Sequence, residues 1–320
     1  MCDKLTIVMY HYVRDLKDSR YPNIKGLDLD LFDQQLDFIE KNYNVVTMEQ
    51  VIAATQQDSK ETLPQNPILL TFDDGYSDHF INVFPKLHNR GMQGSFFVSA
   101  RAIEEDIVMN VNKIHYILAN APIQQLVKDV FALLDKYRKE GYDLKPTNEL
   151  YSKLAIASRF DDKDTIFVKR LLQNEINEEV RSKMADELLE KYVDISQKVL
   201  SKELYLNMEQ IRCMKKAGMF FGIHAYEHYW LGKIPKDKME SDIDRALDYF
   251  DEVIDRDNWV MNYPYGSYND DVIAHIKKRG CKLGLGTGVR IADLSKDDRF
   301  TLPRLDTNDL PPKSENYKKL

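Results

Sequence analysis

The amino-acid sequence predicts an α/β protein with a parallel sheet, either a barrel or a doubly wound sheet, that is interrupted by a helical insertion. Short apolar runs alternate with amphipathic segments in both the first and the last third of the chain, a pattern typical of parallel strands separated by helices. Between these parts the chain is charged and nearly devoid of glycine, and its apolar residues recur at helical spacing. The 320 residues therefore divide into a first part of the sheet (1–105), an insertion (106–205) and a second part of the sheet (206–320).

In the first part of the sheet, the clearest strand pattern is the apolar run Pro67–Phe72. This run stops at Asp73-Asp74-Gly75, as a buried parallel strand does when it ends in a polar loop. Residues 30–41 have helical spacing, with Asp30 as the expected N-cap. The same criteria predict strands at 5–12, 44–47 and 94–99, and helices at 48–55 and 80–90.

The insertion has apolar residues at i, i+3 and i+4 from about residue 112 to 200, which predicts three or four helices. Its runs of mixed charge are typical of solvated helix faces, and a coiled-coil or partner-binding role is the alternative. Strand and helix patterns alternate again from about residue 207. They predict helices at 207–217, 237–255 and 270–279, and strands at 219–224, 259–263, 281–286 and 301–305.

Composition narrows the class of protein. The net charge of −7 disfavours a non-specific nucleic-acid binder, which is normally basic. Cys2, Cys213 and Cys281 are too few for a disulfide framework. No stretch approaches the length of a transmembrane helix, and the apolar run near the N-terminus is too short for a signal peptide, so we expect a cytoplasmic protein of undetermined oligomeric state.

Three predicted strands end in polar residues, and functional groups collect at the carboxyl ends of parallel strands. After the first, Asp73 and Asp74 are costly to bury without a partner, and a metal ion paired with one would leave the other as a base. An Asp-Asp-Gly turn is the alternative. After the second, His224 and His228 are spaced to bind a divalent metal, or they are two unrelated loop histidines.

The third strand end is Asn262-Tyr263-Pro264-Tyr265-Gly266. Such a turn can direct a backbone N–H at a developing oxyanion, and an ordinary Pro-Gly turn is the alternative. Taken together, the three ends indicate a site with one carboxylate and two imidazoles. Iron oxygenases share that ligand set, but the second, adjacent carboxylate favours hydrolysis.

These residues carry a resemblance to a known family. Thr71-Phe72-Asp73-Asp74-Gly75, His224-x-x-x-His228 and Tyr263-Pro264-Tyr265-Gly266 resemble, in order, three motifs of the polysaccharide deacetylases (carbohydrate esterase family 4, NodB homology). The resemblance covers about residues 1–105 and 205–310. It implies a distorted (β/α) barrel of about seven parallel strands that binds one divalent metal, with Zn²⁺ favoured over Co²⁺, Ni²⁺, Mn²⁺ and Fe²⁺.

The resemblance also implies roles for single residues. Asp74, His224 and His228 would hold the metal, and Asp73 would be the base that takes a proton from the attacking water. The backbone N–H of Tyr265 would complete an oxyanion hole. Attack on an N-acetyl carbonyl would release acetate and a free amine.

The chain departs from the family pattern at three places. The late histidine that acts as general acid in many members is missing, and His11 in a Tyr-His motif resembles the arrangement of other members; a buried structural histidine is the alternative. Ala225 replaces the usual Ser or Thr after the first metal histidine. The usual arginine partner of the base is absent near Asn262, and Arg304, unless it lies on the surface, would take its place.

We therefore expect a metal-dependent de-N-acetylase of an N-acetylated amino sugar, with an intracellular glycan precursor preferred as substrate. One alternative is hydrolysis of a non-sugar C–N bond in a cyclic imide or amide. Another is a catalytically weak glycan-binding protein on the same fold, against which the presence of both aspartates argues.

Overall fold

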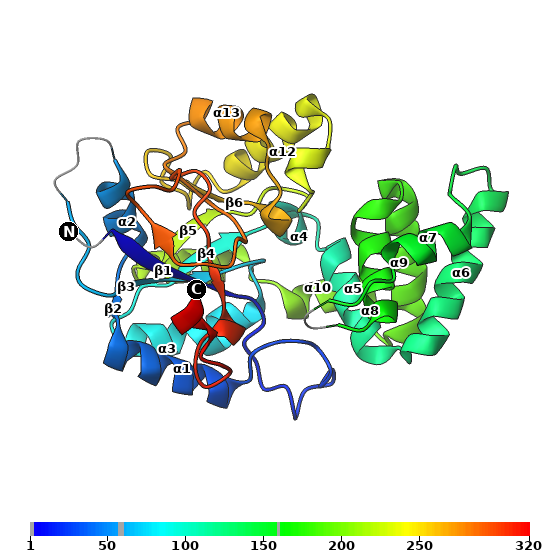
Figure 1. Cartoon of the computed structure of the whole chain (residues 1–320), viewed down its shortest axis with the longest axis horizontal. Coiled ribbons are helices and arrows are strands. Elements are labelled where there is room, and N and C mark those ends of the chain that lie inside the picture. The colour runs from blue at the N-terminus through cyan, green and yellow to red at the C-terminus, as the bar shows by residue number, and fades with distance from the viewer. Residues whose placement is uncertain (1–2, 57–60, 159–160) are drawn as a thin grey trace. The chain divides into compact units, whose positions relative to one another are not determined.

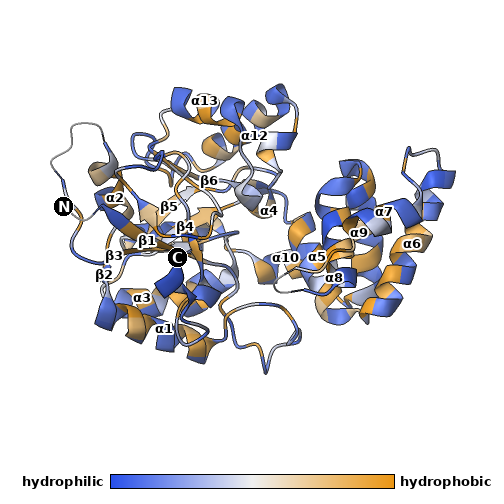
Figure 2. Ribbon diagram, in the orientation of Figure 1, coloured by the Kyte–Doolittle hydropathy of each residue, from blue (hydrophilic) through white to orange (hydrophobic). Residues whose placement is uncertain are grey.

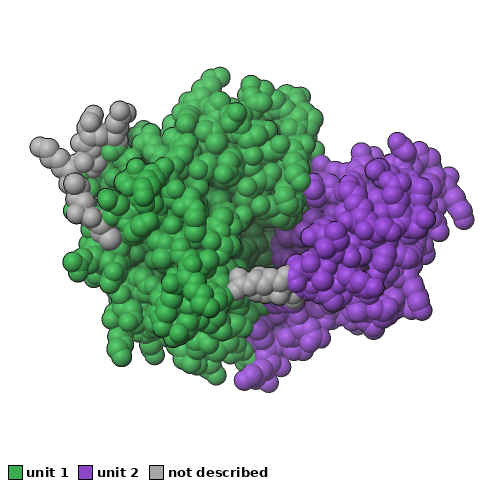
Figure 3. Space-filling model, in the orientation of Figure 1, with its two compact units in different colours: residues 1–15, 26–107, 201–320 green, residues 16–25, 108–200 purple. Residues whose placement is uncertain are grey.

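The computed structural model describes residues 3–56, 61–158 and 161–320, which form two compact units (Figure 3). Unit 1 spans 1–15, 26–107 and 201–320, and unit 2 spans 16–25 and 108–200. Cys2 lies outside the described residues, whereas Cys213 and Cys281 carry free thiols. Within the described ranges, no helix combines the length and apolar character needed to cross a bilayer.

Unit 1 is built on a strongly curled, mostly parallel sheet (Figure 1). Its main path has the strand order β7-β6-β5-β4-β3-β1-β8, while β2 pairs with β3 and β9 with β1. Among the strands of the described ranges, only β8 runs antiparallel to its neighbour, which is β1. The predicted α/β class with a distorted barrel of about seven strands is thus confirmed. The strands are β1 (Lys4–Tyr10), β2 (Asn44–Val45), β3 (Pro67–Phe72), β4 (Ser95–Val98), β5 (Phe220–Ile223), β6 (Val260–Asn262), β7 (Leu283–Leu285), β8 (Ala292–Asp293) and β9 (Leu305–Asp306).

The segment 302–306 links the two sides of the curled sheet. Leu302 forms a parallel bridge with Leu285 of β7, and Leu305 pairs with Val8 of β1. The predicted strand at 301–305 is reduced to β9 because Pro303 cannot donate a ladder hydrogen bond between these two contacts. Arg304 therefore lies between a residue bridged to β7 and a residue paired with β1.

Helices cover the sheet with their apolar sides, so that the centre of unit 1 is hydrophobic (Figure 2). In α1 the buried residues are Phe32, Gln35, Leu36 and Ile39, at the predicted spacing. The N-cap of α1 is Asp28 rather than Asp30, because Asp28 accepts the backbone N–H of Asp30. The helices of unit 1 are α1 (Leu29–Asn42), α2 (Met48–Thr55), α3 (Phe84–Asn89), α4 (Ala100–Glu104), α11 (Met208–Lys216), α12 (Lys236–Tyr249) and α13 (Asp270–Lys278).

Two predicted helices differ in the structure. The helix expected at 80–90 begins as a π-helical turn, His79–Val83, and continues as α3, because Pro85 cannot donate to the carbonyl four residues earlier. The helix expected at 237–255 ends at Tyr249, since Phe250, Val253 and Ile254 turn into the hydrophobic core instead of following the helix surface.

Unit 2 is helical, as predicted, but the estimate of three or four helices was too low. Short helices of eight residues, such as α7 and α8, are separated by loops that the apolar periodicity did not reveal. The last helix, α10, continues into unit 1. The helices over this stretch are α5 (Asn110–Asn120), α6 (Ile123–Lys139), α7 (Thr147–Leu154), α8 (Lys163–Arg170) with the π-helical turn Leu171–Glu175, α9 (Glu178–Tyr192) and α10 (Gln197–Leu204).

Candidate active site

Asp73 and Asp74 follow β3 directly and are both buried. The backbone N–H of Asp73 still donates to Tyr10 of β1, at 2.9 Å, so the strand pairing carries the first carboxylate into the site. Asp74 and Gly75 then take positive φ values of 73° and 71°. A Cβ at Gly75 would lie 2.5 Å from Val98 Cγ1, so this turn requires glycine.

The carboxylate of Asp73 is held by Arg304 and Asn262. Arg304 donates to both oxygens of Asp73 at 2.8 Å, and the amide of Asn262 donates to Oδ1 at 2.6 Å. Burial alone would raise the pKa of Asp73, but the ion pair with Arg304 outweighs burial and lowers the pKa to about 2. Asp73 is therefore ionised at neutral pH.

Arg304 uses all of its donors in this arrangement. Besides Asp73 it bonds the carbonyl of Gly286, the hydroxyl of Thr71 and the side-chain oxygen of Asn262, at 2.9, 3.1 and 2.9 Å. Its guanidinium carries five N–H groups and makes five hydrogen bonds. Only 1% of Arg304 is exposed, so it is not a surface arginine.

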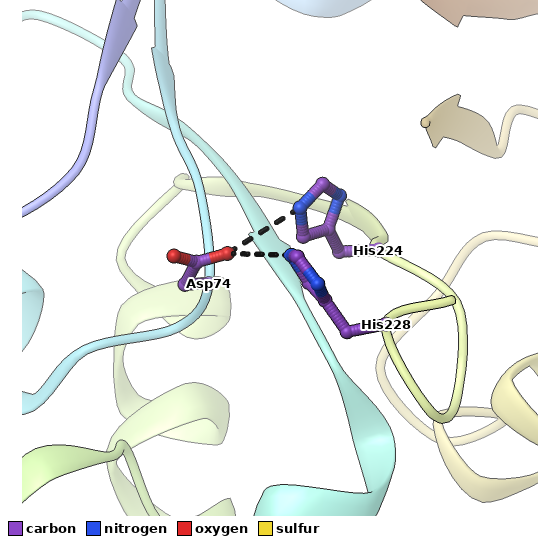
Figure 4. A group of neighbouring side chains, drawn as sticks. All are labelled: Asp74, His224 and His228. Atoms are coloured by element: carbon purple, nitrogen blue, oxygen red, sulfur yellow. Dashed lines mark ion pairs between the residues drawn. The ribbon is translucent and has the colours of Figure 1, made fainter. Parts of the chain in front are cut away.

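Asp74, His224 and His228 converge from β3 and from the loop after β5 (Figure 4). Asp74 Oδ1 lies 3.4 Å from His224 Nε2 and 3.2 Å from His228 Nε2. Two ligands bound at about 2.1 Å to one ion are separated by roughly 3 to 3.5 Å, so these spacings suit a shared cation. Burial would raise the pKa of Asp74, but the two imidazoles close to its carboxylate outweigh burial and hold the pKa well below its usual value.

The remaining polar atoms of this cluster fix which atoms can bind a metal. Tyr76 donates to Asp74 Oδ2 at 2.5 Å, while the buried Oδ1 has no hydrogen-bond partner among the described residues. His224 Nδ1 donates to the backbone carbonyl of Asn262 at 2.8 Å, which leaves the Nε2 lone pair for a metal. The pKa of His228 is lowered by burial, which favours the neutral, ligating form. One carboxylate and two neutral imidazoles fit a divalent cation.

Tyr265 lies beside this cluster in the short 3₁₀ turn Pro264–Gly266. Its backbone is left-handed, with φ at 58°, which is uncommon for a non-glycine residue. Its ring meets the ring of His228 at 4.7 Å and stacks on Trp230 at 4.5 Å. These contacts hold the strained turn next to the second histidine.

His11 follows β1 and approaches the site from the other side. Its Nε2 is 3.9 Å from Asp73 Oδ2, and its side chain is 39% exposed, so it is not a buried histidine. The buried His79 fixes the backbone here, because its Nε2 donates to the His11 carbonyl at 2.9 Å. Burial lowers the pKa of His79 to about 4, so His79 is neutral at neutral pH.

The structure thus brings all seven sequence-predicted residues to one end of the sheet. Sequence reasoning assigned no role to Tyr76, His79 or the side chain of Asn262. Tyr76 directly follows the first motif and Asn262 directly precedes the third, and these positions were the available signal. His79 carries no such signal, because its contact with His11 joins positions 68 residues apart.

A curled α/β sheet with a buried Asp-His-His cluster beside an ionised aspartate defines a hydrolase with a candidate metal site. A family model described as polysaccharide deacetylase matches residues 60–142 and 152–284, more than half of the chain. The chain therefore belongs to the polysaccharide deacetylase family. A curated protein of Bacillus subtilis (strain 168), named "Putative polysaccharide deacetylase YxkH", is 29% identical over 101 residues, which are 31% of this chain and 33% of that protein.

Solved structures show the same fold at low sequence identity. The deacetylase PplD of Streptococcus pyogenes, in complex with acetate, has a TM-score of 0.61 at 18% identity, over 99% of this chain and 96% of that chain. A de-N-acetylase from Aggregatibacter actinomycetemcomitans has a TM-score of 0.57 at 17% identity, over 98% and 99% of the two chains. IcaB from Ammonifex degensii has a TM-score of 0.55 at 18% identity, over 99% and 95%.

Proposed function

We propose that this chain hydrolyses the N-acetyl amide of an amino sugar, in a glycan or a glycan precursor, with a divalent metal held by Asp74, His224 and His228. The observation that carries the proposal is the separation of tasks between the two adjacent aspartates. Asp74 Oδ1 faces both imidazoles, whereas both oxygens of Asp73 are bonded to Arg304. A site that only held a metal would not need the second, separately positioned carboxylate.

The metal, when bound, acts as a Lewis acid that polarises the amide carbonyl and makes water nucleophilic near neutral pH. Asp73, ionised and fixed by Arg304, accepts a hydrogen bond from the attacking water and receives its proton. The backbone N–H of Tyr265 is the proposed donor to the developing oxyanion. His11 is the proposed acid that protonates the amine, which leaves poorly without a proton.

The test is a simultaneous assay of acetate and free amine, with metal content measured on the same sample. Substrate arms are oligomers of N-acetylglucosamine and a nucleotide-linked N-acetylhexosamine. We expect equimolar acetate and amine in at least one arm, loss of both after chelation, and about one metal ion per chain. His228→Ala should lose metal and activity, whereas His275→Ala, a buried histidine paired with Asp244, should keep the metal.

Each other outcome identifies a different function. Opening of a cyclic imide without release of acetate from either sugar would favour a hydrolase of non-sugar C–N bonds. Saturable sugar binding without turnover in the metal-loaded protein would favour a glycan-binding protein. Elemental analysis also tests zinc as the proposed metal against cobalt, nickel, manganese and iron.

We propose the cytoplasm as the compartment and a glycan precursor as the preferred substrate. Free thiols at Cys213 and Cys281 support a reducing compartment. A higher kcat/KM for the nucleotide-linked sugar than for the oligomers is the expected result. The reverse order would assign the chain to a polymeric glycan.

His11→Ala is expected to lower kcat on the N-acetylated sugar by about 10²- to 10⁴-fold, the range for loss of a general acid. The exposed His11 side chain is near Asp73 but is not one of the clustered metal ligands, so metal content should stay the same. His88→Ala, at another exposed histidine, is the matched control. Full activity of His11→Ala would assign the acid to a different group.

A further inference from the structure

The loop that joins the two metal-ligating histidines is strained. Ala225 and His228 both have left-handed backbones, with φ values of 60° and 58°, and neither is a glycine. Non-glycine residues keep such conformations only where their surroundings impose them. The loop is not helical between these positions, so ordinary helix hydrogen bonds do not supply the constraint.

The constraint comes from Asp242 on α12. Its Oδ2 accepts the backbone N–H of Tyr226 at 3.0 Å, and its Oδ1 accepts that of Glu227 at 2.9 Å. Asp242 is 4% exposed, although it lies on a helix whose other acidic residues are exposed or half-buried. One buried carboxylate therefore binds both central amides of the loop.

Helix α4 holds the opposite side of the same loop. The backbone N–H groups of Ala100 and Arg101 donate to the carbonyls of Ala225 and Tyr226, at 3.3 and 3.1 Å. The carbonyls of Ala225 and Tyr226 are thus held by main-chain donors, whereas the amides of Tyr226 and Glu227 are bound by a single side chain. At position 225 an alanine offers no side-chain oxygen that could replace the carboxylate.

We propose that Asp242 is a positioning residue for the metal centre, which fixes the turn between His224 and His228 and thereby raises metal affinity. The proposal rests on the proposed function, because it takes Asp74, His224 and His228 as the ligands. Groups outside the ligand set commonly change metal affinity by about 10- to 100-fold. Asp242 contacts main-chain amides rather than the imidazoles. Its proposed effect is therefore on how His224 and His228 are oriented relative to each other.

The test is Asp242→Asn, an isosteric change that replaces one acceptor oxygen with a donor amide facing a loop N–H. Affinities for Zn²⁺ and Co²⁺ are measured by chelator competition at pH 8, because burial raises the pKa of Asp242 to about 7 and the wild-type carboxylate must be ionised. We expect binding about 10- to 100-fold weaker than wild type, with a changed visible spectrum of the Co²⁺ form.

Asp244→Asn is the matched control, because it removes the same charge from the same helix at a residue that bonds His275 and Arg279 instead. It should keep wild-type metal affinity, even if its Tm falls. Asp242→Glu keeps the charge but displaces the carboxylate by one methylene. It should also bind metal more weakly, and it serves if Asp242→Asn does not fold.

Wild-type affinity in Asp242→Asn or Asp242→Glu would overturn the inference. So would a fall in Tm of the metal-free protein with no change in affinity, since that result assigns Asp242 a structural role alone. If the wild-type protein itself binds metal no better than His228→Ala, the metal assignment fails instead. The two failures are therefore distinguishable without any assay of catalysis.

Discussion

Asp73→Asn is expected to lower kcat for deacetylation by at least about 10³-fold while the protein still binds its metal. The substitution keeps the shape of the side chain, but a neutral amide cannot receive the proton of the attacking water. The metal should remain because Asp73 is outside the cluster of Asp74, His224 and His228. The measurement pairs kcat with metal content per chain, both on protein purified in parallel.

The control for this variant is Asp293→Asn. Asp293 is also buried and paired with a cation, Lys4, but it lies beside the first residue of β1, at the end of the strand opposite the site. We expect normal turnover there. Loss of metal in Asp73→Asn would make Asp73 a ligand and contradict the proposed separation of tasks. Unchanged turnover would transfer the role of base to another residue.

The residues at the strand ends were predictable because parallel strands place their carboxyl ends at one edge of a sheet. The apolar run Pro67–Phe72 located Asp73 and Asp74, and the short strand before His224 located the second ligand group. Periodicity thus determined the order of the elements and which residues follow each strand. It also gave the helical character of the insertion.

Other features depend on contacts that periodicity does not encode. Helix α12 ends at Tyr249 because Phe250 turns into the core. In the sequence, Asp242 does not differ from the other acidic residues of that helix, and only its contacts with the loop after β5 distinguish it. The predicted number of helices in unit 2 was too low. Short helices separated by polar loops give a sequence pattern that looks like one longer helical segment. Local pattern predicts elements, while tertiary packing decides where they end.

The pairing of Arg304 with Asp73 shows how far motif reasoning extends. The third strand end has Asn262 where the resemblance implies an arginine, so the partner of Asp73 had to come from elsewhere. The closing segment 302–306 supplies it, because Leu302 and Leu305 fix Arg304 between β7 and β1. Asn262 keeps a part of that role, since its amide bonds both Asp73 and Arg304.

Arg304→Met is expected to destabilise the protein by about 3–5 kcal/mol, because it leaves the buried charge of Asp73 without its partner. Lost hydrogen bonds at Gly286 and Thr71 add to this cost. Urea unfolding of the metal-free protein at pH 7.5 measures the difference. The free energy of unfolding of Arg304→Lys should lie between those of the wild type and Arg304→Met. An ammonium keeps the charge but cannot bond both carboxylate oxygens in the way that a guanidinium does.

The pH dependence of the same measurement separates the charge from the packing. In the wild type the pKa of Asp73 is lowered, so its stabilising contribution is complete above the unfolded value of 3.8 and is lost only as pH falls toward about 2. Between pH 4.5 and 7.5, Asp73 therefore adds no pH dependence to the free energy of unfolding of the wild type. In Arg304→Met, burial without the ion pair raises the pKa of Asp73, so the penalty should grow as pH rises through that window.

The double variant Asp73→Asn/Arg304→Met completes the test. It removes both charges, so we expect it to be more stable than Arg304→Met alone and to lose the pH slope, because replacing both members of a buried pair costs less than removing one. Additive losses in the two single variants would mean that the residues do not interact energetically. That result would leave Asp73 without the partner that keeps it ionised and in place, and the proposed base would need another source of its low pKa.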